Sequence, residues 1–183
     1  MTIMESNYRF IGKTCEIAKT LGASAIRINF YKDFNNLANK SLKSLTGKNL
    51  KKVIFQIGTL VKTAEKNLDF KVNFENSLAT TGKNKSTCGA GTNKLQIDTN
   101  GNVTPCIALA HLYSAPIKKG LVEEWQNNPI FNQWLKTFTL IKGKCNICGY
   151  RYICGGGCRA NVFGVTNNIF SSDPWCWFQP KNK

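Results

Sequence analysis

The sequence predicts an α/β segment at the N-terminus, followed by a small α+β domain that is rich in cysteine. Three observations indicate this division. Helix-type and strand-type hydrophobic spacing alternate over residues 1–77. A polar, glycine-containing stretch, "LATTGKNKST", follows from Leu78 to Thr87, and seven of the eight cysteines come after it. A chain of 183 residues is long enough for one or two domains with hydrophobic cores.

The N-terminal segment alternates helices and strands. Apolar residues recur at helical spacing over residues 8–21, and Gly22 stands where glycine commonly ends a helix. Ser24–Phe30 alternates polar and apolar residues as a strand does. A second helix is expected over Leu50–Lys66 and a second strand over Phe70–Glu75. This order is typical of a parallel α/β sheet, and because two strands cannot form an independent one, we expect the end of a larger α/β domain.

The second part, residues 78–183, is expected to contain a β-hairpin and short helices. Between Cys88 and Cys106, apolar and polar residues alternate on both sides of "TNGN", which is typical of a hairpin turn. The return strand would bring the second thiol back toward the first. Leu121–Phe138 has the spacing of one or two short helices with aromatic residues in the core, interrupted at Pro129.

The cysteine content indicates metal binding more than disulfide bonding. The sequence has no apolar stretch of the roughly 20 residues that a membrane-spanning helix needs, and its N-terminus lacks the layout of a secretory signal. We therefore expect a cytoplasmic protein without membrane contact. In that reducing compartment, eight cysteines are typical of metal ligands or catalytic groups. A structural role in disulfides or packing is the alternative.

The formal net charge of +15 raises the question of nucleic-acid binding, because clustered lysines and arginines bind phosphates. The lysines are scattered along the chain, however, and only four arginines are present. Clusters held by thiolates would also lower the net charge. We do not expect a nucleic-acid partner, although a basic surface for an acidic peptide remains open.

The stretch "CNICGYRYICGGGC" places Cys145, Cys148, Cys154 and Cys158 within fourteen residues. Two cysteines that are separated by two residues can bind one metal centre, and this spacing serves zinc and iron–sulfur clusters alike. The three glycines Gly155–Gly157 would let the backbone approach a bulky cluster and direct N–H groups at its sulfides. The alternative is that they form an ordinary turn.

The number of possible ligands bears on the choice of metal. Apart from Cys15, which stands on the apolar side of an expected helix, the chain has seven cysteines. Two closed zinc sites of four thiolates would need eight, and His111 could complete at most one of them. Iron–sulfur clusters accept a ligand other than cysteine. A zinc-ribbon-like module that contacts nucleic acid or protein remains the alternative function.

The cysteine spacing resembles the SPASM domain, the C-terminal cluster domain of radical S-adenosylmethionine (SAM) enzymes. Its pattern is a cysteine, 9 to 15 residues, a glycine, four residues and a cysteine, then C-x2-C-x5-C-x3-C and a final cysteine. The chain has twelve residues before Gly101, four after it, the same central spacing, and seventeen residues before the last cysteine. "CGGGCRA" and "DPWC" are also similar to the versions in peptide- and tetrapyrrole-modifying members.

The resemblance implies two auxiliary 4Fe-4S clusters with interleaved ligands. For the first cluster it implies Cys88, Cys106 and Cys158. For the second cluster it implies Cys145, Cys148, Cys154 and Cys176. The stretch before Cys88 contains no thiol that could be a fourth ligand of the first cluster, so we expect an open iron there. By the same resemblance, residues 1–77 are the C-terminal end of a partial TIM-like (β/α) barrel and residues 78–183 are the SPASM domain.

The family begins its chemistry at a different cluster, which is bound by a C-x3-C-x2-C loop, and no such motif occurs in this sequence. We therefore expect that SAM is bound only through an N-terminal part that this sequence lacks, and that this chain alone does not start a radical. The resemblance implies an oxidoreductase or maturase that modifies a peptide, a protein or a peptide-derived cofactor. The clusters would relay electrons or bind substrate, with the missing radical SAM half or a partner chain, and with ferredoxin or flavodoxin as electron donor.

Overall fold

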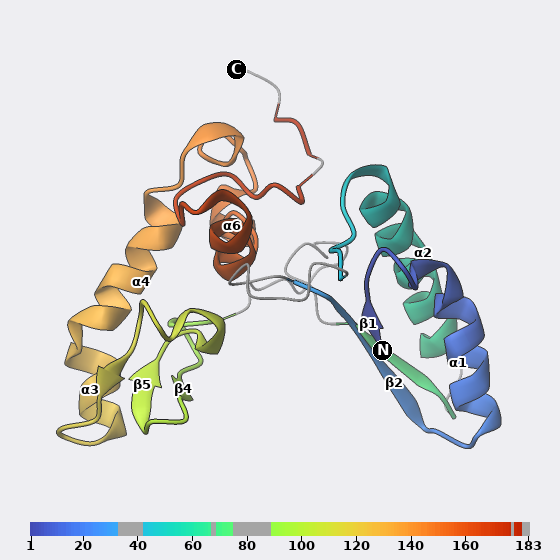
Figure 1. Cartoon of the computed structure of the whole chain (residues 1–183), viewed down its shortest axis with the longest axis horizontal. Helices are drawn as coiled ribbons and strands as arrows, with labels where there is room; N and C mark the ends of the chain where they lie inside the picture. Colours follow the sequence, from blue (N-terminus) through green and yellow to red (C-terminus); the bar gives the residue numbers. More distant parts are fainter. Residues whose placement is uncertain (33–41, 67–68, 75–88, 177, 181–183) are drawn as a thin grey trace. The chain divides into compact units, whose positions relative to one another are not determined.

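The computed structural model describes residues 1–32, 42–66, 69–74, 89–176 and 178–180, and their elements fall into two units (Figure 1). The first unit comprises residues 1–81 and the second comprises residues 82–183. Each unit has its own three-stranded sheet within the described residues. The identification of the two units as a barrel segment and a SPASM domain stays a prediction.

The first unit is a parallel sheet in the order β1-β2-β3 with helices between the strands. Its elements are β1 (Thr2–Ile3), η1 (Tyr8–Phe10), α1 (Ile11–Thr20), β2 (Ala25–Phe30), α2 (Gly47–Glu65) and β3 (Lys71–Phe74). Because successive strands are added in one direction and such crossovers are right-handed, both helices must cover the same face of the sheet. Figure 1 shows them together on one side of it.

The alternation of β2 explains which face the helices cover. Ile26, Ile28 and Phe30 are buried, whereas Ala25 and Arg27 on the other face are exposed. The helices contribute a stripe of apolar residues at helical spacing, which in α2 consists of Leu50, Val53, Ile54 and Ile57. Within the described residues, the sheet therefore has one face in the core and one face that is open.

Cys15 belongs to this core and not to the cysteine-rich unit. It lies one turn after Ile11 on the buried side of α1 and is 8% exposed. Burial raises the pKa of its thiol, so that the unreactive protonated form is favoured. Cys15 therefore acts as a small apolar side chain in the first unit.

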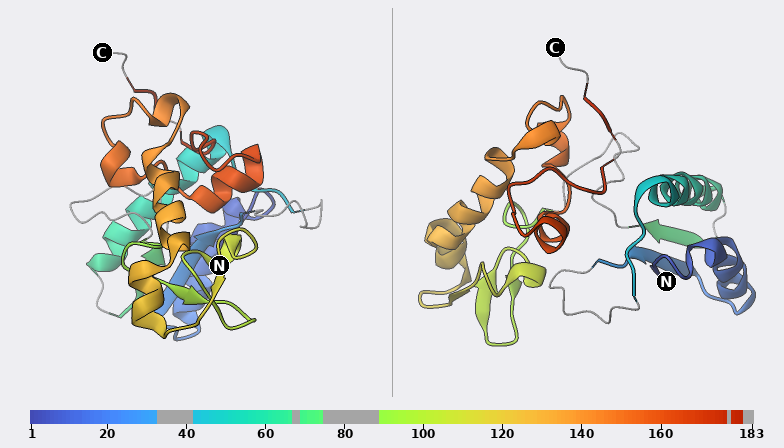
Figure 2. Two further views of the ribbon diagram at one scale, coloured as in Figure 1. Left: turned by 90° about the vertical axis from the view of Figure 1, so that its left-hand side faces the viewer. Right: turned by 45° about the horizontal axis from the view of Figure 1, so that its top comes forward.

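The second unit combines a small antiparallel sheet, in the order β4-β5-β6, with short helices. Its elements are β4 (Gln96–Ile97), β5 (Asn102–Thr104), η2 (Ile107–Leu109), β6 (Ala115–Pro116), α3 (Leu121–Asn127), α4 (Pro129–Thr139), η3 (Gly143–Cys145), α5 (Arg151–Cys154) and α6 (Arg159–Thr166). Figures 1 and 2 place the sheet and α6 on the same side of α4. The third strand, β6, was not expected from the sequence.

The turn of the β4-β5 hairpin is held by Asp98. Its Oδ1 atom accepts hydrogen bonds from the backbone N–H groups of Asn100 at 2.8 Å and Asn102 at 2.9 Å. Gly101 completes the turn with a φ of +78°, a conformation that costs glycine little. The hairpin predicted around "TNGN" is therefore present, and it leads the chain toward Cys106.

Trp134 of α4 is the centre of the second core, with 1% of its surface exposed. Its ring makes an edge-to-face contact with Tyr113 at 5.4 Å between centroids, and its Nε1–H donates to the carbonyl of Ala90 at 2.8 Å. Pro129 begins α4, where its missing N–H costs nothing, and Asn128 caps the helix by accepting from the Ile130 N–H. The expected helix break at Pro129 is therefore a boundary between two helices.

None of the helices in the described ranges is long and apolar enough to cross a bilayer.

Candidate metal centre

Three of the cysteines assigned to the second cluster lie close enough to influence one another. Burial raises the pKa of the Cys154 thiol, and the negative charges of Cys176, Asp173 and Cys145 raise it further, while a hydrogen bond from the Gly157 N–H lowers it. Burial likewise raises the pKa of Cys176, with Cys145 again contributing. The fold thus brings Cys176 together with thiols that precede it by more than twenty residues in the sequence.

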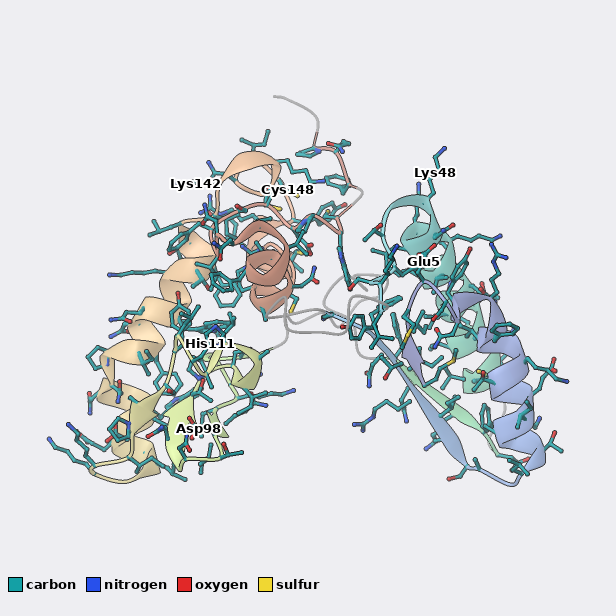
Figure 3. All side chains as sticks on the ribbon, viewed as in Figure 1. Glu5, Lys48, Asp98, His111, Lys142 and Cys148 are labelled. Atoms are coloured by element: carbon teal, nitrogen blue, oxygen red, sulfur yellow. The ribbon has the colours of Figure 1, made fainter. Side chains whose placement is uncertain are left out.

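Cys148 and His111 are well separated within this unit. Cys148 is half-buried on the loop between η3 and α5. Figure 3 shows Cys148 and Lys142 at the same end of the unit, whereas His111 lies nearer the hairpin that carries Asp98. The His111 ring packs against Phe163 of α6 at 6.3 Å between centroids. His111 is therefore not placed to complete a site around Cys148.

The first set of assigned cysteines is described only in part, because Cys88 lies outside the described residues. Cys106 directly follows the hairpin, and its N–H donates to the buried Thr104 hydroxyl at 3.2 Å. Cys158 is the residue before the first turn of α6. The hydrogen bond from Trp134 to Ala90 fixes the backbone shortly after residue 88. The assignment of ligands to both clusters stays a prediction.

Within the described residues, no group of three or more His, Cys, Asp or Glu side chains is arranged to hold a single metal ion. The ligands of a 4Fe-4S cluster surround four irons, so they need not converge on one point as zinc ligands must. Whether this chain suits such a cluster therefore depends on the surroundings of the thiols.

The glycines between Cys154 and Cys158 permit a close approach of side chains to the backbone. Gly155, Gly156 and Gly157 have φ values of +63°, +71° and +81°. A Cβ atom on Gly157 would lie 1.9 Å from Oδ2 of Asp173. One on Gly156 would lie 2.6 Å from the Ile141 Cδ1 atom and 2.8 Å from Nη2 of Arg159. The loop therefore needs glycine both for its backbone conformation and for the space that a side chain would fill.

Arg159 connects this loop to the segment before Cys176 by hydrogen bonds. Sequence reasoning did not identify it as a functional residue. The side chain is 2% exposed. Its Nη1 atom donates to the carbonyls of Ile169 at 2.9 Å and Ser171 at 3.0 Å, and its Nη2 atom donates to the Gly156 carbonyl. Burial lowers the pKa of the guanidinium, and the nearby Asp173 carboxylate and cysteine sulfurs oppose that effect. The one signal in the sequence was an arginine directly after the last cysteine of "CGGGC".

The first turn of α6 carries buried polar atoms that have no hydrogen-bond partner among the described residues. They are the Nε atom of Arg159 and both polar atoms of the Asn161 carboxamide, a side chain that is 1% exposed. Buried polar atoms are normally paired. Unpaired donors beside Cys158 suit a site that receives an additional group with acceptor atoms, as the sulfides of an iron–sulfur cluster are. The donor set and the thiols therefore fit such a cluster.

No family model matches the chain. An AdoMet-dependent heme synthase of Methanosarcina barkeri is 26% identical over 199 residues, which cover 100% of this chain and 56% of the relative. A PqqA peptide cyclase of Streptomyces rochei is 29% identical over 96 residues, covering 50% of this chain and 26% of the relative. The chain thus spans at most about half the length of these curated relatives.

Two solved structures share the fold of the chain. Streptococcus suis SuiB bound to S-adenosylmethionine has a TM-score of 0.63 and 18% identity, and the match covers 97% of this chain and 44% of SuiB. Native anSMEcpe with bound AdoMet has a TM-score of 0.69 and 16% identity, covering 96% of this chain and 50% of that protein. Both structures support a mixed α/β fold. The homologues of this chain are radical SAM/SPASM-type maturases, and the chain matches a part of such a protein.

Proposed function

We propose that the second unit is the auxiliary iron–sulfur domain of a radical SAM maturase and holds two 4Fe-4S clusters. The observation that carries this proposal is the proximity of the partly buried Cys154 and Cys176 to the buried Cys145, around a glycine loop that Arg159 hydrogen-bonds and Asp173 approaches. The unpaired donors of α6 support it. The first cluster is assigned to Cys88, Cys106 and Cys158. The second is assigned to Cys145, Cys148, Cys154 and Cys176.

The first unit is proposed to be the end of the partial barrel. The support is a parallel sheet with helices on one face and an exposed opposite face, marked by Arg27 on β2. In a (β/α) barrel, the helices lie outside and the other face of each strand points into the barrel. The proposed boundary remains between residues 77 and 78.

The residues around the thiols define what the chain contributes to the chemistry. A bound 4Fe-4S cluster supplies one-electron transfer. The nearby Gly157 N–H lowers the pKa of the Cys154 thiol, which opposes the effect of burial and favours the thiolate form that a metal needs. Lys144 donates to the carbonyl of Cys176, and its charge lowers the pKa of that thiol. Burial still raises the pKa of both thiols, so these contacts offset only part of the cost of forming two of the four thiolates of the second cluster.

The proposed substrate is a peptide, a protein or a peptide-derived cofactor. It is supported by the PqqA peptide cyclase, and by a structure of anSMEcpe with AdoMet and a peptide, which has a TM-score of 0.66. In this proposal the domain relays electrons or binds the substrate in the cytoplasm, and ferredoxin or flavodoxin is the electron donor. SAM cleavage is assigned to a C-x3-C-x2-C segment that this sequence does not contain.

The proposal is tested by purifying the chain without oxygen and measuring iron, acid-labile sulfide and zinc. We expect a brown protein with about eight irons, whose visible absorption is bleached by dithionite. Cys148→Ala should lose about half of the iron, whereas Cys15→Ala, which removes a buried thiol of the other unit, should keep all of it. A colourless protein that contains zinc and no labile sulfide would contradict the proposal, and equal iron in both variants would contradict the ligand assignment.

A further inference from the structure

Arg159 is a buried cation in a part of the chain that has few charges inside. Among the described residues, the buried charged side chains are Glu124, Arg159 and Asp173. Removing a guanidinium from water is unfavourable unless hydrogen bonds and opposite charge compensate it. The fold must therefore provide that compensation, and its source indicates what Arg159 does.

The hydrogen bonds of Arg159 join the glycine loop, which connects cysteines of both assigned clusters, to the segment that leads to the last ligand of the second cluster. Its Nη2 atom donates to Gly156, which lies between Cys154 and Cys158. Its Nη1 atom donates to Ile169 and Ser171, which lead toward Cys176. A planar guanidinium can reach three carbonyls at fixed angles, which a lysine ammonium on a flexible stem cannot do as well. Arg159 thereby sets the spacing between the glycine loop and the last ligand segment.

The acidic groups near Arg159 come from both assigned ligand sets. Its guanidinium interacts electrostatically with the Asp173 carboxylate and with the sulfurs of Cys145, Cys154 and Cys158. Cys145 and Cys154 belong to the second set, and Cys158 belongs to the first. Asp173 supplies one negative charge for one positive charge. Thiolate-bound clusters at these two ligand sets would add negative charge near the same guanidinium.

We propose that Arg159 is a positioning residue and the shared counter-ion of both auxiliary clusters, and that its charge raises both reduction potentials. This inference rests on the function proposed above. Reduction adds one electron to a cluster, so the reduced state is the more negative one and is stabilised more by a nearby cation. The unpaired Nε–H is available as a further donor toward cluster sulfur, a contact that acts in the same direction.

The test is a redox titration of the reconstituted chain, with dithionite as reductant and electron paramagnetic resonance as the readout. Arg159→Met should lower the equilibrium constant for reduction of each cluster on the order of tenfold, which is about 59 mV toward negative potential for one electron. Arg159→Lys should keep both reduction potentials near the wild-type values. It should retain less iron, because a lysine ammonium cannot make the hydrogen bonds of the planar guanidinium equally well. Lys142→Met removes an equal charge from an exposed site near Cys145 and should shift neither potential by a comparable amount.

The outcomes separate the two proposals. Wild-type protein without iron and sulfide would overturn the proposed function itself. Loaded wild-type and Arg159→Met proteins with equal potentials would overturn only the counter-ion inference, as would a shift in one cluster alone. If Arg159→Met fails to bind iron, loading of Arg159→Lys supports the need for the charge. Failure of both variants would assign Arg159 to hydrogen bonding alone and overturn the inference.

Discussion

The approach of Gly157 to Asp173 makes the glycine loop sensitive to a single methyl group. Gly157→Ala adds a Cβ atom at a φ of +81° and within 1.9 Å of the Asp173 carboxylate. The backbone conformation alone should cost about 1–2 kcal/mol for alanine. The buried carboxylate must also move, which breaks its 2.8 Å hydrogen bond from the Trp175 N–H at a cost of about 1.5–3 kcal/mol. The variant should therefore lose about 2.5–5 kcal/mol in total.

Gly101→Ala is the matched control, because Gly101 has a φ of +78° but no atom within 4 Å of the point where a Cβ would stand. It should lose only the conformational part, about 1–2 kcal/mol. Anaerobic guanidinium unfolding followed by tryptophan fluorescence measures this difference in the second unit, since all four tryptophans lie after residue 120. A Gly157→Ala protein that is as stable as Gly101→Ala would refute the close approach of Asp173 to the loop.

Two further predictions concern the second core and the hairpin. Trp134→Phe should destabilise this unit by about 1–3 kcal/mol in the same unfolding assay, because the carbonyl of Ala90 loses its buried donor; an equal loss in Trp125→Phe would argue against that bond. The Asn102 N–H holds the pKa of the Asp98 carboxyl below its usual value. The ionised Asp98 carboxylate should therefore stabilise the fold fully above the ordinary carboxyl pKa of about 3.9. This stabilisation should disappear as the pH falls through the lower pKa of the folded protein. The chemical shift of the Asn102 backbone amide should follow the titration of Asp98. A midpoint at or above the ordinary carboxyl pKa would contradict the predicted lowering.

Elements with long or distinctive patterns were predictable from the sequence. The apolar stripe of Leu50 to Ile57 indicated α2, and the alternation of Ile26 to Phe30 indicated β2, because the periods of helix and strand differ. Asn100 and Gly101 indicated the hairpin turn. Strands β1 and β6 were missed because each has two residues, too few to show any period.

The metal-binding chemistry of the candidate site was predictable from the sequence, but the residues that contact and position its loops were not. The spacing of Cys145, Cys148, Cys154 and Cys158 indicated a metal centre without any coordinates. The roles of Arg159 and Asp173 could not be inferred, because their partners are separated from them in the sequence. Arg159 reaches Ser171 across twelve positions, and Asp173 approaches the glycine loop from sixteen residues beyond Gly157.

The local elements, the cysteine spacing and the resemblance that these support can be read from the order of residues, since period, turn chemistry and ligand spacing act between near neighbours. Which thiols come close together, and that Arg159 lies near Cys145, Cys154 and Cys158, became apparent from the folded chain alone. Chain folding brings Cys176 near Cys145 and Cys154, and Arg159 bridges the glycine loop and the segment before Cys176 with hydrogen bonds that need a fixed geometry. Long-range proximity of this kind depends on the packing of the whole unit, which no local pattern encodes.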